Sequence, residues 1–154
     1  MVTMQTVGSA VLQAQTVEDA LGVYLALVHD LQPGVAREEA ESVLSRYSKK
    51  TLGSLLVVAK GKPAFPASTA SAVEAFKEER NWLVHRSRGL QRLALHSDVE
   101  LEAFVERVGR VGDEGLRLQE EITELMLRHL QSLGFARDRI EAEAQGIFAG
   151  WHGT

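Results

Sequence analysis

The stretch from Ser97 to Gly134 constrains the fold most, because its apolar residues recur every three or four positions. That spacing places them on one side of an α-helix. The apolar positions are Leu101, Phe104, Val105, Val108, Leu118, Ile122, Leu125, Met126, Leu130 and Leu133. Ser97 and Glu100 have the spacing of a capping box, and Gly134 suits a helix end. The sequence therefore predicts one long helix here.

The rest of the chain also carries helical patterns. They cover residues 9–31, 35–48, 68–87 and 136–149, the last being short. The apolar run 52–59 could be a short helix or a strand. We predict a helix, because no second strand candidate exists to pair with it. The expected fold is all-α, an up-and-down bundle of four main helices plus a short C-terminal helix.

Caps and breakers mark where these helices begin and end. Pro33 and Gly34 stop the first helix. Thr51 is a plausible N-cap for the short run, and Ser68 or Thr69 for the helix that follows. Residues 90–96 form a connector. We expect a single domain over residues 1–154, with loose termini at 1–8 and 150–154.

Composition excludes several classes of protein. The chain has 154 residues and no cysteine, which rules out disulfides, thiol nucleophiles and cysteine-ligated zinc. No apolar run reaches the roughly 20 residues that span a bilayer, and the N-terminus lacks the pattern of a signal peptide. We therefore expect a cytoplasmic protein with no membrane partner. The net charge of −4 argues against a generally basic nucleic-acid binder.

Positive charge nevertheless gathers in one place. Five basic residues lie between positions 77 and 92, against two acidic ones. They are Lys77, Arg80, Arg86, Arg88 and Arg92. A local cluster of this kind can hold one or two phosphates without making the whole protein basic.

Within this cluster, Arg80 falls inside the apolar stripe of its helix, four residues after Phe76. An arginine there is costly unless something pairs with it or water reaches it. Asn81 and His85 are four residues apart, so their side chains lie on one face of the helix beside Arg80. The helix therefore presents a guanidinium, a carboxamide and an imidazole close together.

The sequence Arg80-Asn81-x-x-x-His85 resembles the Arg-x4–6-His motif of the HEPN superfamily. The resemblance implies a small all-helical domain that forms a homodimer, and many such domains are metal-independent ribonucleases. Some are the toxins of toxin–antitoxin pairs, so an antitoxin protein is a possible partner. Two copies of the motif would meet across the dimer cleft, and each chain would carry half of a site.

The chemistry of RNA cleavage gives these residues roles. Without metal, the 2′-hydroxyl of RNA can act as the nucleophile if one group moves its proton and a cation stabilises the phosphate. We expect His85 to be the general acid or base, Arg80 the electrostatic stabiliser and Asn81 the positioning group. Lys77, Arg86 and Arg88 are the expected phosphate-binding residues. We predict no metal site and no cofactor.

A non-catalytic reading of the same residues also stands. Arg80 could be a buried arginine paired with a carboxylate on another helix, such as Glu18 or Asp19, and His85 could be an exposed helix histidine. The protein would then be a helical dimerisation module, or one that binds nucleotides or RNA. In the enzyme, Arg80 and His85 should point into an open basic cleft. In the module, a carboxylate should cap Arg80 and His85 should face water.

Three other features of the sequence bear on these readings. Trp82 lies away from the apolar stripe, which favours an interface or partly exposed position over stacking on a base. Ser87 stands where some HEPN proteins carry a tyrosine that a partner enzyme adenylylates, which puts that mode of neutralisation in doubt. The triplet Gly109, Gly112 and Gly115 either lets a neighbouring backbone approach closely or marks a kink.

Overall fold

The computed structural model describes the backbone of residues 2–89 and 98–142, and the side chains of residues 7–86 and 98–142. Its helices are α1 (Val2–Leu25), α2 (Arg37–Ser48), α3 (Leu52–Lys60), α4 (Ala67–Gly89) and α5 (Asp98–Ser132), with a π-helical turn η1 at Ala26–Asp30. Residues 137–142 are also helical. No residue in these ranges belongs to a strand, so the all-α prediction is confirmed.

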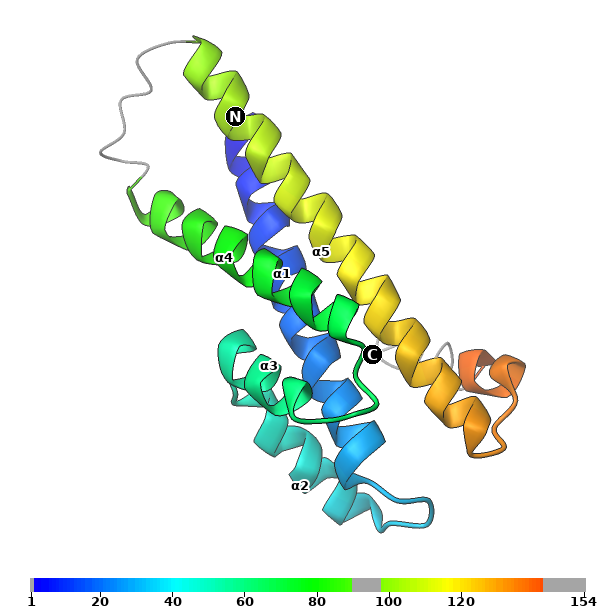
Figure 1. Cartoon of the computed structure of the whole chain (residues 1–154). Helices are drawn as coiled ribbons and strands as arrows, with labels where there is room; N and C mark the ends of the chain where they lie inside the picture. The colour runs from blue at the N-terminus through cyan, green and yellow to red at the C-terminus, as the bar shows by residue number, and fades with distance from the viewer. Residues whose placement is uncertain (1, 90–97, 143–154) are drawn as a thin grey trace, which may run out of the picture.

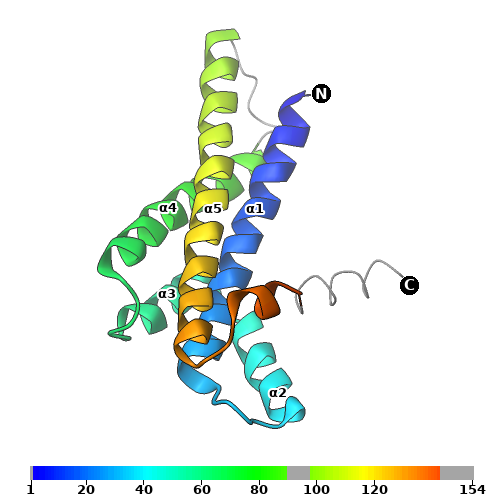
Figure 2. The same ribbon diagram turned by 90° about the vertical axis from the view of Figure 1, so that its right-hand side faces the viewer.

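Successive helices reverse direction, which brings α1 and α5 side by side in the same direction (Figures 1 and 2). Nε2 of Gln13 on α1 donates a hydrogen bond to Oε1 of Gln119 on α5 over 2.8 Å, which shows which residues of the two helices lie side by side. Helix α4 runs antiparallel to α5. Thr69, early in α4, contacts Glu121, late in α5, whereas Glu79 further along α4 contacts Arg107 earlier in α5. Helices α2 and α3 lie against the second half of α1, so α1 contacts every other helix of the bundle.

The core forms where α1, α3, α4 and α5 meet. Its largest fully buried side chains are Phe76, Leu21, Leu25, Leu52, Leu55, Leu56, Leu83, Leu118, Ile122, Val17, Val73 and Val108. Each of these helices contributes residues three or four positions apart, as a single buried helix face requires. Phe76 and Leu83 come from the motif helix α4, so the core fixes its rotation about its own axis.

One of the three glycines in α5 allows close packing. A Cβ atom on Gly115 would lie 2.8 Å from Cγ of Gln13 and 3.3 Å from the ring of Phe76. A Cβ atom on Gly112 would lie 3.9 Å from Cα of Ala10, whereas Gly109 has nothing within 4 Å. Helix α5 continues unbroken through all three. The close-approach alternative therefore holds at Gly115, whereas an added Cβ at Gly112 would make ordinary van der Waals contact.

The ambiguous run forms helix α3, as predicted. Thr51 is its N-cap, and its hydroxyl accepts a hydrogen bond from the backbone N–H of Ser54. The Ser54 hydroxyl in turn accepts one from the N–H of Thr51, which completes a capping box. Leu52, Leu55, Leu56 and Ala59 are buried. Tertiary burial and a good cap together stabilise this short helix.

The expected starts of α1 and α4 differ from the structure. Helix α1 begins at Val2, and Val7 is already buried, so residues 2–8 are helical and not loose. Helix α4 begins at Ala67 and neither Ser68 nor Thr69 caps it. The buried hydroxyl of Thr69 instead donates to Oε1 of Glu121 on α5. Because Thr69 is buried, its hydroxyl needs a partner within the protein, and the carboxylate of Glu121 supplies it.

The first helix ends through a π-helical turn. The N–H of Leu31 donates to the carbonyl of Ala26, which is the five-residue spacing of a π-helix. Gly34 follows with φ +88°, as the expected breaker. At this end, Asp30 accepts hydrogen bonds from Tyr47 and Arg46 of α2. These bonds hold α2 against the end of α1.

Burial of Tyr47 and its hydrogen bond to Asp30 raise its pKa to about 12. Below pH 10 the tyrosine is protonated in both the folded and the unfolded chain, so folding is unaffected. Between pH 10 and 12 only the unfolded chain loses the proton, and folding stability falls. We expect the wild type to lose about 1 kcal/mol more than Tyr47→Phe by pH 11. Urea unfolding of both proteins at pH 9 and 11 measures this. Equal losses would contradict the raised pKa.

Helix α5 ends as the sequence predicts. Gly134 has φ +95°, and the N–H of Phe135 donates to the carbonyl of Leu130. This is the Schellman pattern, which favours glycine. The predicted connector 90–96, the Ser97 cap and residues 143–149 of the predicted C-terminal helix lie outside the described residues, as does the terminus 150–154. Among the helices of the described ranges, none has the length and hydropathy to cross a membrane.

Candidate functional site

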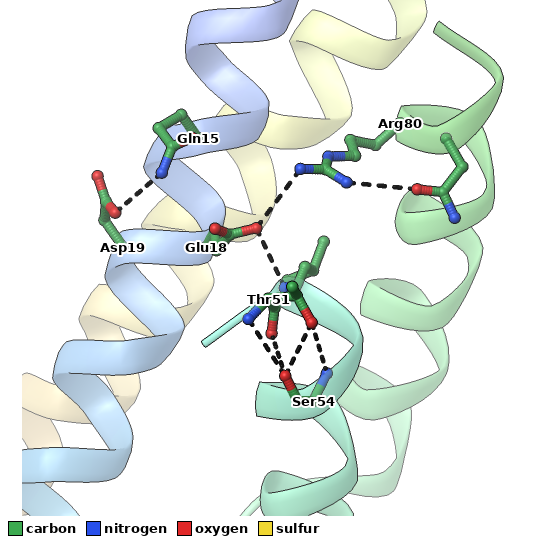
Figure 3. Close-up of polar contacts among 8 residues, drawn as sticks. Gln15, Glu18, Asp19, Thr51, Ser54 and Arg80 are labelled. Carbon is green, nitrogen blue, oxygen red and sulfur yellow. Dashed lines mark hydrogen bonds and ion pairs between the residues drawn. The ribbon is translucent and has the colours of Figure 1, made fainter. Parts of the chain in front are cut away.

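Arg80 reaches from α4 across to α1. Its Nη2 lies 3.7 Å from Oε2 of Glu18, and its Nη1 donates to Oδ1 of Asn81 over 3.4 Å (Figure 3). The Arg80 side chain is 32% exposed, while that of Glu18 is 15% exposed. Both contacts are long, so much of the hydrogen-bonding capacity of the guanidinium remains available to another acceptor. Arg80 is thus paired with Glu18 and also partly accessible to water.

Glu18 has a second, shorter contact. The backbone N–H of Leu52, in the first turn of α3, donates to the same Oε2 over 3.1 Å. A carboxylate is favourable there, because the first N–H groups of a helix have no partner within it and carry partial positive charge. Glu18 therefore joins α1 to α3 through the backbone and to α4 through Arg80. Asp19 lies apart, where it accepts a hydrogen bond from Gln15 (Figure 3).

Asn81 and His85 follow Arg80 along α4. Asn81 is partly buried beside Arg80, whereas His85 is exposed one turn further on. Their spacing of four places both on the same side of the helix. Arg86 is exposed as well, but it follows His85 directly and so points in a different direction. The structure thus groups Arg80, Asn81 and Glu18 through contacts, and His85 through its position on the helix.

The expected phosphate-binding residue Lys77 already has partners. Its Nζ lies 2.7 Å from Oε1 of Glu74, and Lys60 contacts the other oxygen of the same carboxylate. Hydrogen bonds from Lys60 and Lys77 lower the pKa of Glu74 to about 2. An incoming phosphate would have to compete with Glu74 for Lys77. Arg88 belongs to α4, but its side chain and that of Ser87 lie outside the described residues.

Trp82 lies on the other side of α4, where it packs within the chain. Its ring centre is 5.7 Å from that of Phe104, and the guanidinium of Arg107 lies 3.8 Å over the ring. Glu79 pairs with Arg107 over 3.0 Å, and this contact lowers the pKa of the glutamate. Trp82 is partly exposed, which is one of the two positions that the sequence favoured. The side of its ring that faces α5 takes part in aromatic packing and a cation–π contact within the chain.

No metal site takes shape within the described ranges, where no three histidine or acidic side chains gather closely enough to hold an ion.

His29 sits in the π-helical turn, and its Nε2 is buried with no hydrogen-bond partner. Burial lowers the pKa of His29, with Lys62 adding to the effect. This environment favours a neutral imidazole, whose ring lies edge-to-face with that of Tyr24 at 5.9 Å between centroids.

Comparisons with protein-family models, with curated proteins and with the solved structures gave no match to this chain. The case for a function therefore depends on the geometry of α4 and its surroundings.

The arrangement can bind an anion. Arg80 offers a planar guanidinium with paired donors, Asn81 a carboxamide and His85 an imidazole, and all three side chains belong to α4. The sequence indicated each of these residues and named Glu18 as one possible partner of Arg80. It missed the contact between Glu18 and the N–H of Leu52. The signal was indirect, because it required knowing that the first turn of α3 lies beside α1.

Proposed function

We propose that this protein is a metal-independent endoribonuclease of HEPN type, cytoplasmic, and active as a homodimer. The observation that carries the proposal is the state of Arg80, which is paired through long contacts and yet one-third exposed. A phosphate oxygen can reach such a guanidinium. His85, exposed one turn away, is then the candidate to move the proton of a 2′-hydroxyl.

A second candidate has its own support. The ion pair between Arg80 and Glu18 is what a non-catalytic module requires, because the carboxylate neutralises the arginine within the chain. His85 faces water, which is the position expected of the module, although a residue of a composite site would also be open to water in a single chain. We rank the ribonuclease first because the long contacts of Arg80 leave donors for a ligand.

The test is cleavage of mixed RNA by purified protein in the presence of EDTA. We expect fragments that end in a 2′,3′-cyclic phosphate, because a 2′-hydroxyl nucleophile leaves that product. His85→Ala, purified in parallel, should yield at least about 10²-fold less product in the same time. Equal cleavage by both proteins would indicate a contaminating nuclease. No cleavage by the wild type on any RNA would favour the non-catalytic module.

The proposed homodimer gives a separate prediction. A composite site needs two chains, so we expect a two-fold dimer with the two α4 helices near the axis. Light scattering at tens of micromolar should report twice the mass of the chain. A monomer there would mean an interface weaker than about −8 kcal/mol and would argue against a shared site. A toxin role and an antitoxin partner belong to the proposal as further consequences of the resemblance.

A further inference from the structure

We infer that Glu18 is a positioning residue for Arg80. Its carboxylate holds the guanidinium of Arg80 at the surface of α4 and releases it to an RNA phosphate. The inference rests on the proposed function, because it assumes that Arg80 meets RNA. It assigns a role to a residue from outside the motif, on a different helix.

The two contacts of Glu18 differ in length. Its Oε2 accepts from the N–H of Leu52 over 3.1 Å, but lies 3.7 Å from Nη2 of Arg80. The backbone contact is of hydrogen-bond length and the arginine contact is longer. Glu18 is therefore held in place by α3, whether or not Arg80 stays beside it.

Glu18 keeps a partner when Arg80 moves away. A buried carboxylate that loses its only partner is costly. Here the carboxylate keeps the N–H of Leu52 and the positive end of α3. The move of Arg80 from Glu18 to a phosphate therefore costs less than the loss of an ordinary buried ion pair. The exposure of Arg80 gives the phosphate a route to it.

The negative charge of Glu18 also affects how strongly Arg80 attracts a phosphate. A carboxylate 3.7 Å away offsets part of the positive charge that a phosphate would meet at Arg80. Glu18 thus weakens RNA binding while it fixes the position of the guanidinium. Removal of its charge should strengthen binding and disturb positioning. These opposite effects distinguish this role from one that only supports the fold.

The substitution to make is Glu18→Gln, which keeps an oxygen for the N–H of Leu52 and removes the charge. The control is Asp19→Asn, which makes the same change of charge one residue along α1. Asp19 is exposed and bonded to Gln15, so it does not touch Arg80. Thermal unfolding first establishes that both variants fold.

The probe is a labelled single-stranded RNA of mixed sequence with 2′-O-methyl riboses, which binds but cannot supply the nucleophile. We expect Glu18→Gln to lower its Kd about fivefold at low salt relative to Asp19→Asn. On cleavable RNA, KM should fall with Kd, while kcat falls as well. In an Arg80→Ala background, Glu18→Gln should change Kd no more than Asp19→Asn does.

The outcomes separate the two proposals. If the wild type binds the probe and Glu18→Gln equals Asp19→Asn, Glu18 does not control Arg80, and the ribonuclease proposal stands. The same conclusion follows if the gain in affinity persists without Arg80. If the wild type neither binds the probe nor cleaves RNA, the proposed function fails, and the role inferred for Glu18 fails with it.

Discussion

Replacing His85 with alanine should lower the rate of RNA cleavage about 10²- to 10⁴-fold, the range for loss of a general acid or base. The free energy of unfolding should stay within about 0.5 kcal/mol of the wild type, because the His85 side chain is exposed. Single-turnover cleavage of a defined RNA measures the first quantity. Urea unfolding measures the second.

The matched control is His129→Ala. His129 is a partly exposed histidine on α5, outside the motif, so its loss should leave cleavage unchanged. Equal losses in both variants would show that the activity does not depend on the motif.

The second large effect should come from Gly115→Ala compared with Gly109→Ala. Both substitutions gain up to about 1 kcal/mol of helix propensity. Only the Cβ at position 115 would meet other atoms, at 2.8 Å from Gln13 and 3.3 Å from Phe76. Overpacking a tight contact costs about 1–3 kcal/mol. Gly109→Ala should therefore be the more stable variant by that amount in urea unfolding.

Removal of the side chain that obstructs the new methyl group tests the cause. In a Gln13→Ala background, Gly115→Ala should cost less, because only the contact with the ring of Phe76 remains. Equal costs in both backgrounds would mean that the flexible Gln13 simply moves aside. Equal stability of Gly115→Ala and Gly109→Ala would contradict the close approach of α1 and α5.

The fold was largely predictable because helix periodicity and caps are local signals. The apolar stripe of α5, the N-cap at Thr51 and the glycine at Gly134 each specify structure over a few residues. The helical start at residues 2–8 was not predictable by the same means. Val7 is buried in a helix that packs mainly against α5, and that contact joins segments far apart in the chain.

The site was predictable in its residues but less so in its contacts. The spacing of Arg80, Asn81 and His85 places them on α4 without any tertiary information. The position of Trp82 in the chain gave no sign of Phe104 and Arg107, which approach from α5. For the same reason, the sequence could not indicate that Lys60 of α3 reaches Glu74, whereas the i,i+3 spacing of Glu74 and Lys77 within α4 is a local signal. Ion pairs between helices depend on rotation about each helix axis, which only the packed core determines.

The parallel pairing of α1 with α5 has a consequence for synthesis of the protein. Gln13 and Gln119 are 106 positions apart, so α1 leaves the ribosome long before its main partner is translated. During that interval the apolar side of α1, with Val17 and Leu21, has no α5 to cover it. Contacts this distant in sequence slow folding and prolong the exposure of apolar surface in the nascent chain. Slower translation of α5 should therefore lengthen the time that α1 is open to chaperones.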